Sequence, residues 1–160
     1  MAVIRQAHRE DCPKILQFIQ ELAEYEKEPD AVEASVATLE EAIFDKKQAN
    51  AVLLEEKGES IGFALYFFNF STWRGRAGLY LEDLYVQPSY RGKGYGKMLL
   101  SYLASQAVKN NCPRFEWIVL NWNKPSIDFY KAMGAKPLSE WTVYRLENEA
   151  LQALAKSYKE

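Results

Sequence analysis

The 160-residue sequence predicts a single mixed α/β domain, residues 1–160, with a mostly antiparallel sheet flanked by helices. Two observations predict this class. The hydrophobic period changes from helical spacing in the first 45 residues to the alternation of strands over residues 50–86. A strand–helix–strand order follows over residues 79–120, which requires a crossover between parallel strands. No repeat, low-complexity tract or linker divides the chain, so one domain is expected.

The N-terminal part predicts one strand and two helices. Residues 2–6 form the strand. The first helix begins at Asp11, a good N-cap residue, has Pro13 in its first turn and fades over residues 25–28. A shorter helix is expected over residues 35–45, where apolar side chains recur on one side.

The rest of the chain predicts a hairpin, a crossover and a helical end. Strands at 50–56 and 61–70 join through the turn at Lys57-Gly58. The further elements expected, in chain order, are a strand at 79–86, a helix at 94–110, a strand at 114–120, a helix at 125–133 ended by Gly134, a strand at 141–147 and a terminal helix.

The charge balance argues against a polyanionic partner. The formal net charge is −2, so binding to nucleic acid or to an acidic membrane has no global electrostatic support. The longest apolar run, residues 61–70, is too short to span a bilayer, and the N-terminus lacks the features of a signal peptide. We therefore predict a cytoplasmic protein with no nucleic-acid or membrane partner.

Histidine and cysteine are scarce, which excludes several kinds of site. The single His8 and the two cysteines, Cys12 and Cys112, cannot build a His-rich or Cys/His metal cluster, so no metal is expected. A Ser–His or Cys–His mechanism would depend on His8 alone. Proton chemistry would therefore fall to carboxylates, tyrosines, lysines or water.

Residues 90–96, YRGKGYG, place three glycines and two cations where a strand meets a helix. The unpaired N–H groups at a helix start stabilise an anion, above all a phosphate, and glycines let the backbone curl around it. The spacing is neither the GxxxxGK[ST] of a Walker A loop nor the GxGxxG of a dinucleotide fingerprint. The glycines alone leave a phosphate site and a plain helix start equally open.

Two adjacent carboxylates, Glu82 and Asp83, interrupt the strand before this loop. Neighbouring side chains on a strand point to opposite faces, so one acid is expected to face inward or into a cleft. Burying a carboxylate without a partner is costly. This acid is therefore either paired or functional.

Residues 91–96, RGKGYG, follow a strand and open a helix, and they resemble the [QR]-x-x-G-x-[GA] acetyl-CoA loop of the GNAT N-acetyltransferase superfamily. Residues 121–135 resemble its second motif, in which an Asn precedes a Tyr by seven positions, here Asn123 and Tyr130. The chain is most similar to the diamine (spermidine/spermine) N-acetyltransferases and their thialysine-acetylating relatives. That likeness is carried by residues 22–26, 61–73, 80–86, 90–96 and 122–135 and by Trp141.

The resemblance implies a GNAT fold with a β-α-β core that binds acetyl-CoA. In the family the loop amides hold the CoA pyrophosphate, the main chain of the preceding strand bonds the pantetheine arm, and the Asn and Tyr of the second motif face the cofactor. The residues thereby expected to bind acetyl-CoA are Leu84, Tyr85, Val86, Arg91, Gly92, Lys93, Gly94, Tyr95, Gly96, Lys97, Asn123, Ser126 and Tyr130.

The resemblance also implies direct acetyl transfer to a primary amine. An alkyl amine with a pKa of about 10.4 is mostly protonated near neutral pH, so a carboxylate has to accept its proton. Glu82 matches the family's glutamate and is the expected base, with Asp83 as the alternative. Backbone N–H groups near Leu84 would stabilise the oxyanion, and Tyr130 would give its phenolic proton to the thiolate.

Acids and aromatic rings also suit a small polyamine or diamine substrate. Ser71 replaces an acid of the polyamine acetylators, and residues 139–141 are less acidic, which leaves a shorter amine such as thialysine open. Two other functions also stay open: acetylation of a protein lysine or N-terminus, and a non-catalytic acyl-CoA-binding role. The resemblance further implies a homodimer with residues 141–147 at its contact. The residues expected to contact the substrate are Tyr25, Glu26, Trp73, Glu82, Asp83, Glu140 and Trp141.

Overall fold

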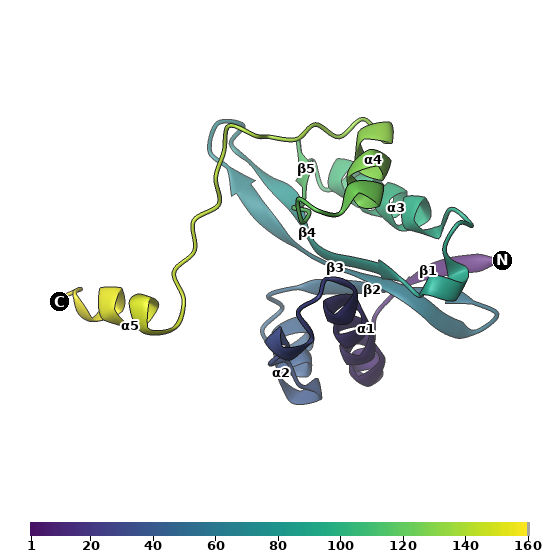
Figure 1. The fold of residues 1–160 in the computed structure, drawn as a ribbon, viewed down its shortest axis with the longest axis horizontal. Coiled ribbons are helices and arrows are strands. Elements are labelled where there is room, and N and C mark those ends of the chain that lie inside the picture. The colour runs from purple at the N-terminus through teal and green to yellow at the C-terminus, as the bar shows by residue number, and fades with distance from the viewer. Residues whose placement is uncertain (160) are drawn as a thin grey trace. The chain divides into compact units, whose positions relative to one another are not determined.

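The computed structural model describes residues 1–159, and these form two compact units (Figure 1). The first unit is Met1–Leu120 and the second begins at Asn121. No helix of the described chain is both long and apolar enough to cross a membrane.

The first unit is built on a five-stranded sheet with the strands in sequence order. The first four strands pair with one another in antiparallel fashion, and the last is parallel to the fourth. This arrangement confirms the predicted mixed, mostly antiparallel sheet. The strands are β1 (Ala2–Gln6), β2 (Asn50–Glu56), β3 (Glu59–Ser71), β4 (Arg76–Val86) and β5 (Phe115–Glu116).

Helices cover both faces of this sheet. Figure 1 shows the first two helices on one face and the third on the other. They are α1 (Cys12–Tyr25), α2 (Val36–Glu40), which continues as one π-helical turn (Glu41–Asp45), and α3 (Tyr95–Lys109). Short 3-10 turns lie at Arg9–Asp11, Pro29–Ala31 and Pro88–Tyr90.

The helices follow from local sequence signals and are held by apolar burial. Ser35 caps α2, because its hydroxyl oxygen accepts a hydrogen bond from the Thr38 N–H at 3.1 Å. Ile15 and Phe18 of α1 are fully buried against the sheet, where the rings of Phe18 and Phe63 stack with centroids 5.8 Å apart. Burying such side chains contributes about 1.5–3 kcal/mol each.

Strand lengths differ from the prediction at the end of the sheet. The β3–β4 hairpin is longer than expected, since β4 already begins at Arg76. The strand predicted at 114–120 was too long, because β5 pairs with β4 only at Leu79↔Phe115 and Tyr80↔Glu116. A strand exists only where a ladder forms, and apolar composition alone does not supply the partner.

The second unit contains the helices α4 (Lys124–Ala132) and α5 (Asn148–Lys156). Gly134 ends the α4 region with a φ of +91°, a conformation that glycine adopts without steric cost. The strand predicted at 141–147 is wrong, because no ladder forms in that part of the described chain. Its β-forming residues lack a partner strand there, and the Tyr144 side chain is 92% exposed.

Candidate active site

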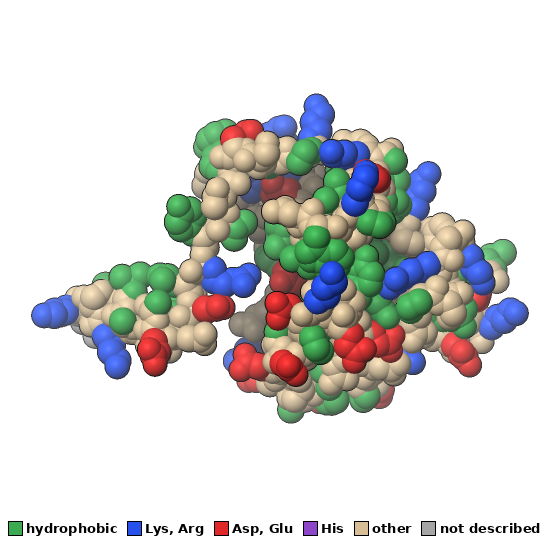
Figure 2. Space-filling model, in the orientation of Figure 1, with side chains coloured by type: hydrophobic (Ala, Val, Ile, Leu, Met, Phe, Trp, Pro, Cys, Tyr) green, Lys and Arg blue, Asp and Glu red, His purple; other side chains and the backbone are tan. Residues whose placement is uncertain are grey.

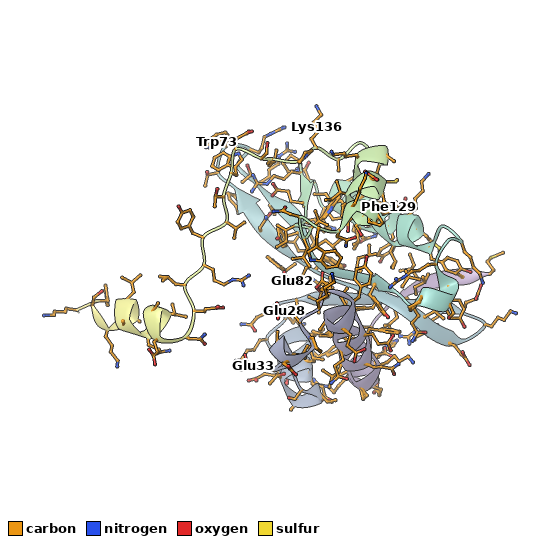
Figure 3. All side chains as sticks on the ribbon, in the orientation of Figure 1. Glu28, Glu33, Trp73, Glu82, Phe129 and Lys136 are labelled. Carbon is orange, nitrogen blue, oxygen red and sulfur yellow. The ribbon has the colours of Figure 1, made fainter. Side chains whose placement is uncertain are left out.

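A β-bulge at Glu82 reorganises the middle of β4. Leu65 of β3 pairs with Asp83, whereas the next residue, Tyr66, pairs with Leu81. Glu82 is therefore the extra residue of the bulged strand, and its side chain is exposed (Figure 3). Asp83 shares the sheet face of its partner Leu65, which is the face covered by α1. The acid expected to face inward is thus Asp83.

Beyond the bulge, β4 presents main-chain groups on the edge opposite β3. The Gln87 N–H donates to the Ile61 carbonyl at 2.9 Å, so these two residues form a hydrogen-bonded pair. Hydrogen-bonded and non-hydrogen-bonded pairs alternate along an antiparallel ladder. By that alternation Leu84 and Val86 direct their N–H and C=O groups away from β3. Pairing with β5 stops at Tyr80, so this edge of β4 carries no ladder with another described strand.

Three carboxylates gather between β4 and the end of α1, and we call Glu26, Glu82 and Asp83 the acid cluster. Burial raises the pKa of Asp83 to about 6, and the negative charges of Glu82 and Glu26 add to the effect. Burial also raises the pKa of Glu26, the C-cap residue that follows α1. A carboxylate with a pKa near 6 is mostly ionised at neutral pH and can accept a proton there.

The acid cluster continues into an acidic surface. Figure 2 shows Asp and Glu side chains gathered over the α1 and α2 part of the first unit. Exposed acids such as Glu28 and Glu33, marked in Figure 3, follow α1 in the chain. Such a surface attracts cations. Trp73 lies instead at the tip of the β3–β4 hairpin, 89% exposed and away from Glu82 in Figure 3.

Residues 90–96, which we call the glycine loop, lead into the N-terminus of α3. Gly92 and Gly94 have φ values of +80° and +83°, and beyond each glycine's chain neighbours no atom lies within 4 Å of where a side-chain Cβ would stand. Gly94 is the N-cap, and the first intrahelical bond recorded there runs from the Met98 N–H to its carbonyl at 3.0 Å. The N–H groups at the start of the 15-residue helix and the cation of Lys97 can therefore meet an anion.

Other side chains of the loop make local contacts. The Lys93 ammonium lies 5.3 Å from the Tyr90 ring centroid, and the Tyr95 hydroxyl donates a hydrogen bond to the Glu56 carboxylate of β2. That bond raises the pKa of Tyr95 and lowers the pKa of Glu56. The contact ties the loop to the sheet. Among described residues, no group of three potential metal-ligating side chains is found.

The second unit carries the other predicted site residues. Asn123 caps α4 and is 5% exposed, and its side-chain oxygen accepts from the Ser126 N–H at 3.4 Å. Tyr130 lies one turn beyond Ser126 on α4, with its ring centroid 5.6 Å from that of Phe129. Glu140 and Trp141 are exposed. The predicted site residues therefore fall in two groups, one in each unit.

Comparison with known proteins identifies the family. A model of the acetyltransferase (GNAT) family matches residues 4–135. The chain belongs to this family. The GNAT chain is 41% identical over 165 residues to the thialysine N-epsilon-acetyltransferase of Bos taurus, with 96% of each chain covered.

Two further proteins are similar to this GNAT chain. It is 36% identical over 163 residues to the spermidine/spermine N(1)-acetyltransferase-like protein 1 of Homo sapiens, covering 95% of the chain and 23% of that protein. A solved integron cassette protein of V. cholerae superposes with a TM-score of 0.82 at 30% identity, with 98% of each chain covered. The chain is accordingly an N-acetyltransferase with the GNAT fold.

Sequence reasoning missed one acid of this GNAT domain, Glu21. Its carboxylate accepts hydrogen bonds from the Tyr85 hydroxyl at 2.8 Å and from the Gln87 side-chain amide at 3.4 Å. Burial and the Glu21 carboxylate raise the pKa of Tyr85 to about 12. The only feature of the sequence that could have indicated Glu21 is its position one helical turn before Tyr25, which puts both residues on the same side of α1.

Proposed function

We propose that this enzyme transfers the acetyl group of acetyl-CoA to the terminal primary amine of a small substrate of the thialysine, diamine or polyamine kind. The observation that carries the proposal is the juxtaposition at the bulge of β4. There, one edge of the strand presents main-chain groups of Leu84 and Val86, and the acid cluster begins at Glu82 and Asp83.

The residues present fit acetyl-CoA. The open backbone around Gly92 and Gly94 and the N-terminus of α3 suit the pyrophosphate, with Lys93 and Lys97 as nearby cations. The edge of β4 that faces away from β3 suits the amide groups of the pantetheine arm, as an added strand would. Acetyl-CoA, when bound, supplies the acetyl thioester. The remaining cofactor contacts proposed are those of Tyr85, Arg91, Tyr95, Gly96, Asn123, Ser126 and Tyr130.

Different residues of the chain are proposed to accept and to donate protons during the transfer. Glu82 is the proposed base and accepts the amine proton directly or through water, while Asp83 keeps the cluster negative and is the alternative base. The Leu84 N–H, which points away from β3, stabilises the negative charge that develops on the carbonyl oxygen. Tyr130 donates its phenolic proton to the departing sulfur.

The amine is recognised by charge and by an aromatic ring. Glu26 and Asp83 attract an ammonium group, and Tyr25, which precedes Glu26 at the end of α1, offers an aromatic ring. The names of the bovine and human relatives refer to thialysine and to spermidine or spermine, which supports an amine with one or more further charged groups. Trp73, Glu140 and Trp141 are proposed as outer contacts of a longer substrate.

We further propose a cytoplasmic homodimer in which residues 141–147 meet the partner copy. The support is apolar exposure: Trp141, Val143 and Tyr144 are 65%, 73% and 92% exposed. Light scattering coupled to size exclusion gives the mass in solution. A dimer that Val143→Asp converts to monomers supports the proposal, and a monomeric wild-type protein overturns it.

A thiol-release assay tests the proposed function. The enzyme is incubated with acetyl-CoA and, in turn, thialysine, lysine, putrescine, spermidine, spermine and a lysine-containing peptide, and free CoA is followed with a thiol reagent. We expect the fastest release with a small amine. Release with the peptide alone, or with no amine at all, would refute the proposal.

A further inference from the structure

Arg91 belongs to the glycine loop by sequence, but its side chain turns back towards the other end of the proposed site. Its Nε donates to the Val86 carbonyl at 2.9 Å. Its guanidinium carbon lies 5.2 Å from the ring centroid of Tyr25 and 5.5 Å from that of Tyr85. The guanidinium thus bridges the edge of β4 and the last residue of α1.

We propose that Arg91 is a positioning residue that acts through Tyr25 and so sets the affinity for the amine. This inference rests on the proposed function, in which Tyr25 contacts the amine. Arg91 then serves the substrate end of the site in addition to its proposed contact with acetyl-CoA in the glycine loop.

The anchor of Arg91 is itself fixed. Tyr85 is buried, its ring is 5.9 Å from that of Phe18, and its hydroxyl donates to Glu21 at 2.8 Å. Although partial burial opposes it, hydrogen bonds from neighbouring side chains lower the pKa of Glu21, so a negative charge lies at the Tyr85 hydroxyl at neutral pH. That charge and the Val86 carbonyl both favour a guanidinium at this place.

Tyr25 needs such a support because of its position. It is the last residue of α1, where a helix frays, and its side chain is 38% exposed. A planar guanidinium over its ring restricts the ring's rotamers and holds the adjoining Glu26 near Glu82 and Asp83. Pre-ordering a binding residue lowers the entropic cost of binding its ligand.

Lys93 provides a contrast within the same loop. Its ammonium lies over the Tyr90 ring at 5.3 Å, and Tyr90 is not among the proposed substrate contacts. Both side chains are exposed cations two residues apart, so replacing either by methionine removes one charge from the loop. Arg91 lies over the Tyr25 ring whereas Lys93 lies over the Tyr90 ring, which makes Lys93→Met the matched control.

The experiment is a double-mutant cycle read by steady-state kinetics and calorimetry. At acetyl-CoA concentrations that saturate each variant, we expect Arg91→Met to raise the amine KM about two- to five-fold, which is the worth of one exposed cation–π contact, with a smaller effect on kcat. Arg91→Lys, which keeps the cation, should restore part of the affinity. In a Tyr25→Leu background, Arg91→Met should no longer change the amine KM.

Several outcomes would overturn the inference. Additive effects of Tyr25→Leu and Arg91→Met would show that Arg91 does not act through Tyr25. An amine KM that falls in Arg91→Met would mean that Arg91 repels the substrate. Equal changes in acetyl-CoA dissociation constant for Arg91→Met and Lys93→Met, with the amine KM unaltered, would leave Arg91 a phosphate contact only. A wild-type enzyme that acetylates no amine would refute the proposed function instead.

Discussion

Replacing Asp83 with asparagine tests the electrostatics of the acid cluster. The substitution keeps the shape of the side chain and removes its charge. The pKa of Asp83 is about 6 in the folded protein against an ordinary value of 3.8, chiefly because the carboxyl is buried. A difference of this size corresponds to about 3 kcal/mol, and the remaining solvent contact of the side chain reduces the expected effect to about 1–3 kcal/mol.

Proton linkage decides in which direction this substitution changes stability at each pH. Because the pKa is higher in the folded protein, the folded state binds this proton more tightly than the unfolded chain does. Stability from this group is therefore fully present below about pH 4 and is lost as the pH rises through about 6. We expect Asp83→Asn to be more stable than the wild type at pH 8, with an advantage that shrinks as the pH falls from about 6 to about 4.

Urea denaturation at a series of pH values measures this difference. Glu33→Gln is the control, since Glu33 is an exposed acid beyond α1 and is not among the causes of the Asp83 shift. The control should differ from the wild type by less than about 0.5 kcal/mol at every pH. An Asp83→Asn protein that is no more stable at pH 8, or whose advantage does not vary with pH, would refute the account of a buried, ionised carboxylate.

Three substitutions test the other parts of the site. Gly94→Val should abolish acetyl-CoA binding in calorimetry. The control Gly58→Val, at a glycine of similar φ (+81°) in the β2–β3 turn, should leave binding intact. Equal losses of binding would contradict the assignment of the glycine loop to the pyrophosphate. Tyr130→Phe should lower kcat by about 10²-fold or more with little change in acetyl-CoA affinity, and parallel losses of both would rule out its role as acid. Glu82→Gln should slow turnover mainly at lower pH, and an unchanged pH–rate profile would move the base to Asp83 or to water.

Helices were predicted well where the signal is local. Ser35 caps α2 as its type suggests, and α3 and α4 lie within one residue of their expected bounds at each end. Capping and apolar spacing act within a few residues, so they can be read along the chain. The strand expected at 141–147 failed, because a strand also needs a partner that the segment does not contain.

The orientation of Glu82 and Asp83 could likewise be predicted only in part from the sequence. Alternation along β4 predicts that one of Glu82 and Asp83 faces inward, but it cannot say which. The choice depends on the register with β3, where the bulge falls at Glu82 and turns Asp83 towards the α1 face. A bulge is a property of two paired strands, so neither strand encodes it alone.

The sequence by itself determined the fold class, the family resemblance and the glycine loop, since these depend on residue type at short spacing. Only the tertiary structure decided where Arg91 points. Its partners Tyr25 and Val86 come from the end of α1 and the end of β4, and Tyr25 precedes it by 66 positions in the chain. A contact of that kind exists only after helix and sheet have packed, because packing brings together side chains that the sequence keeps apart.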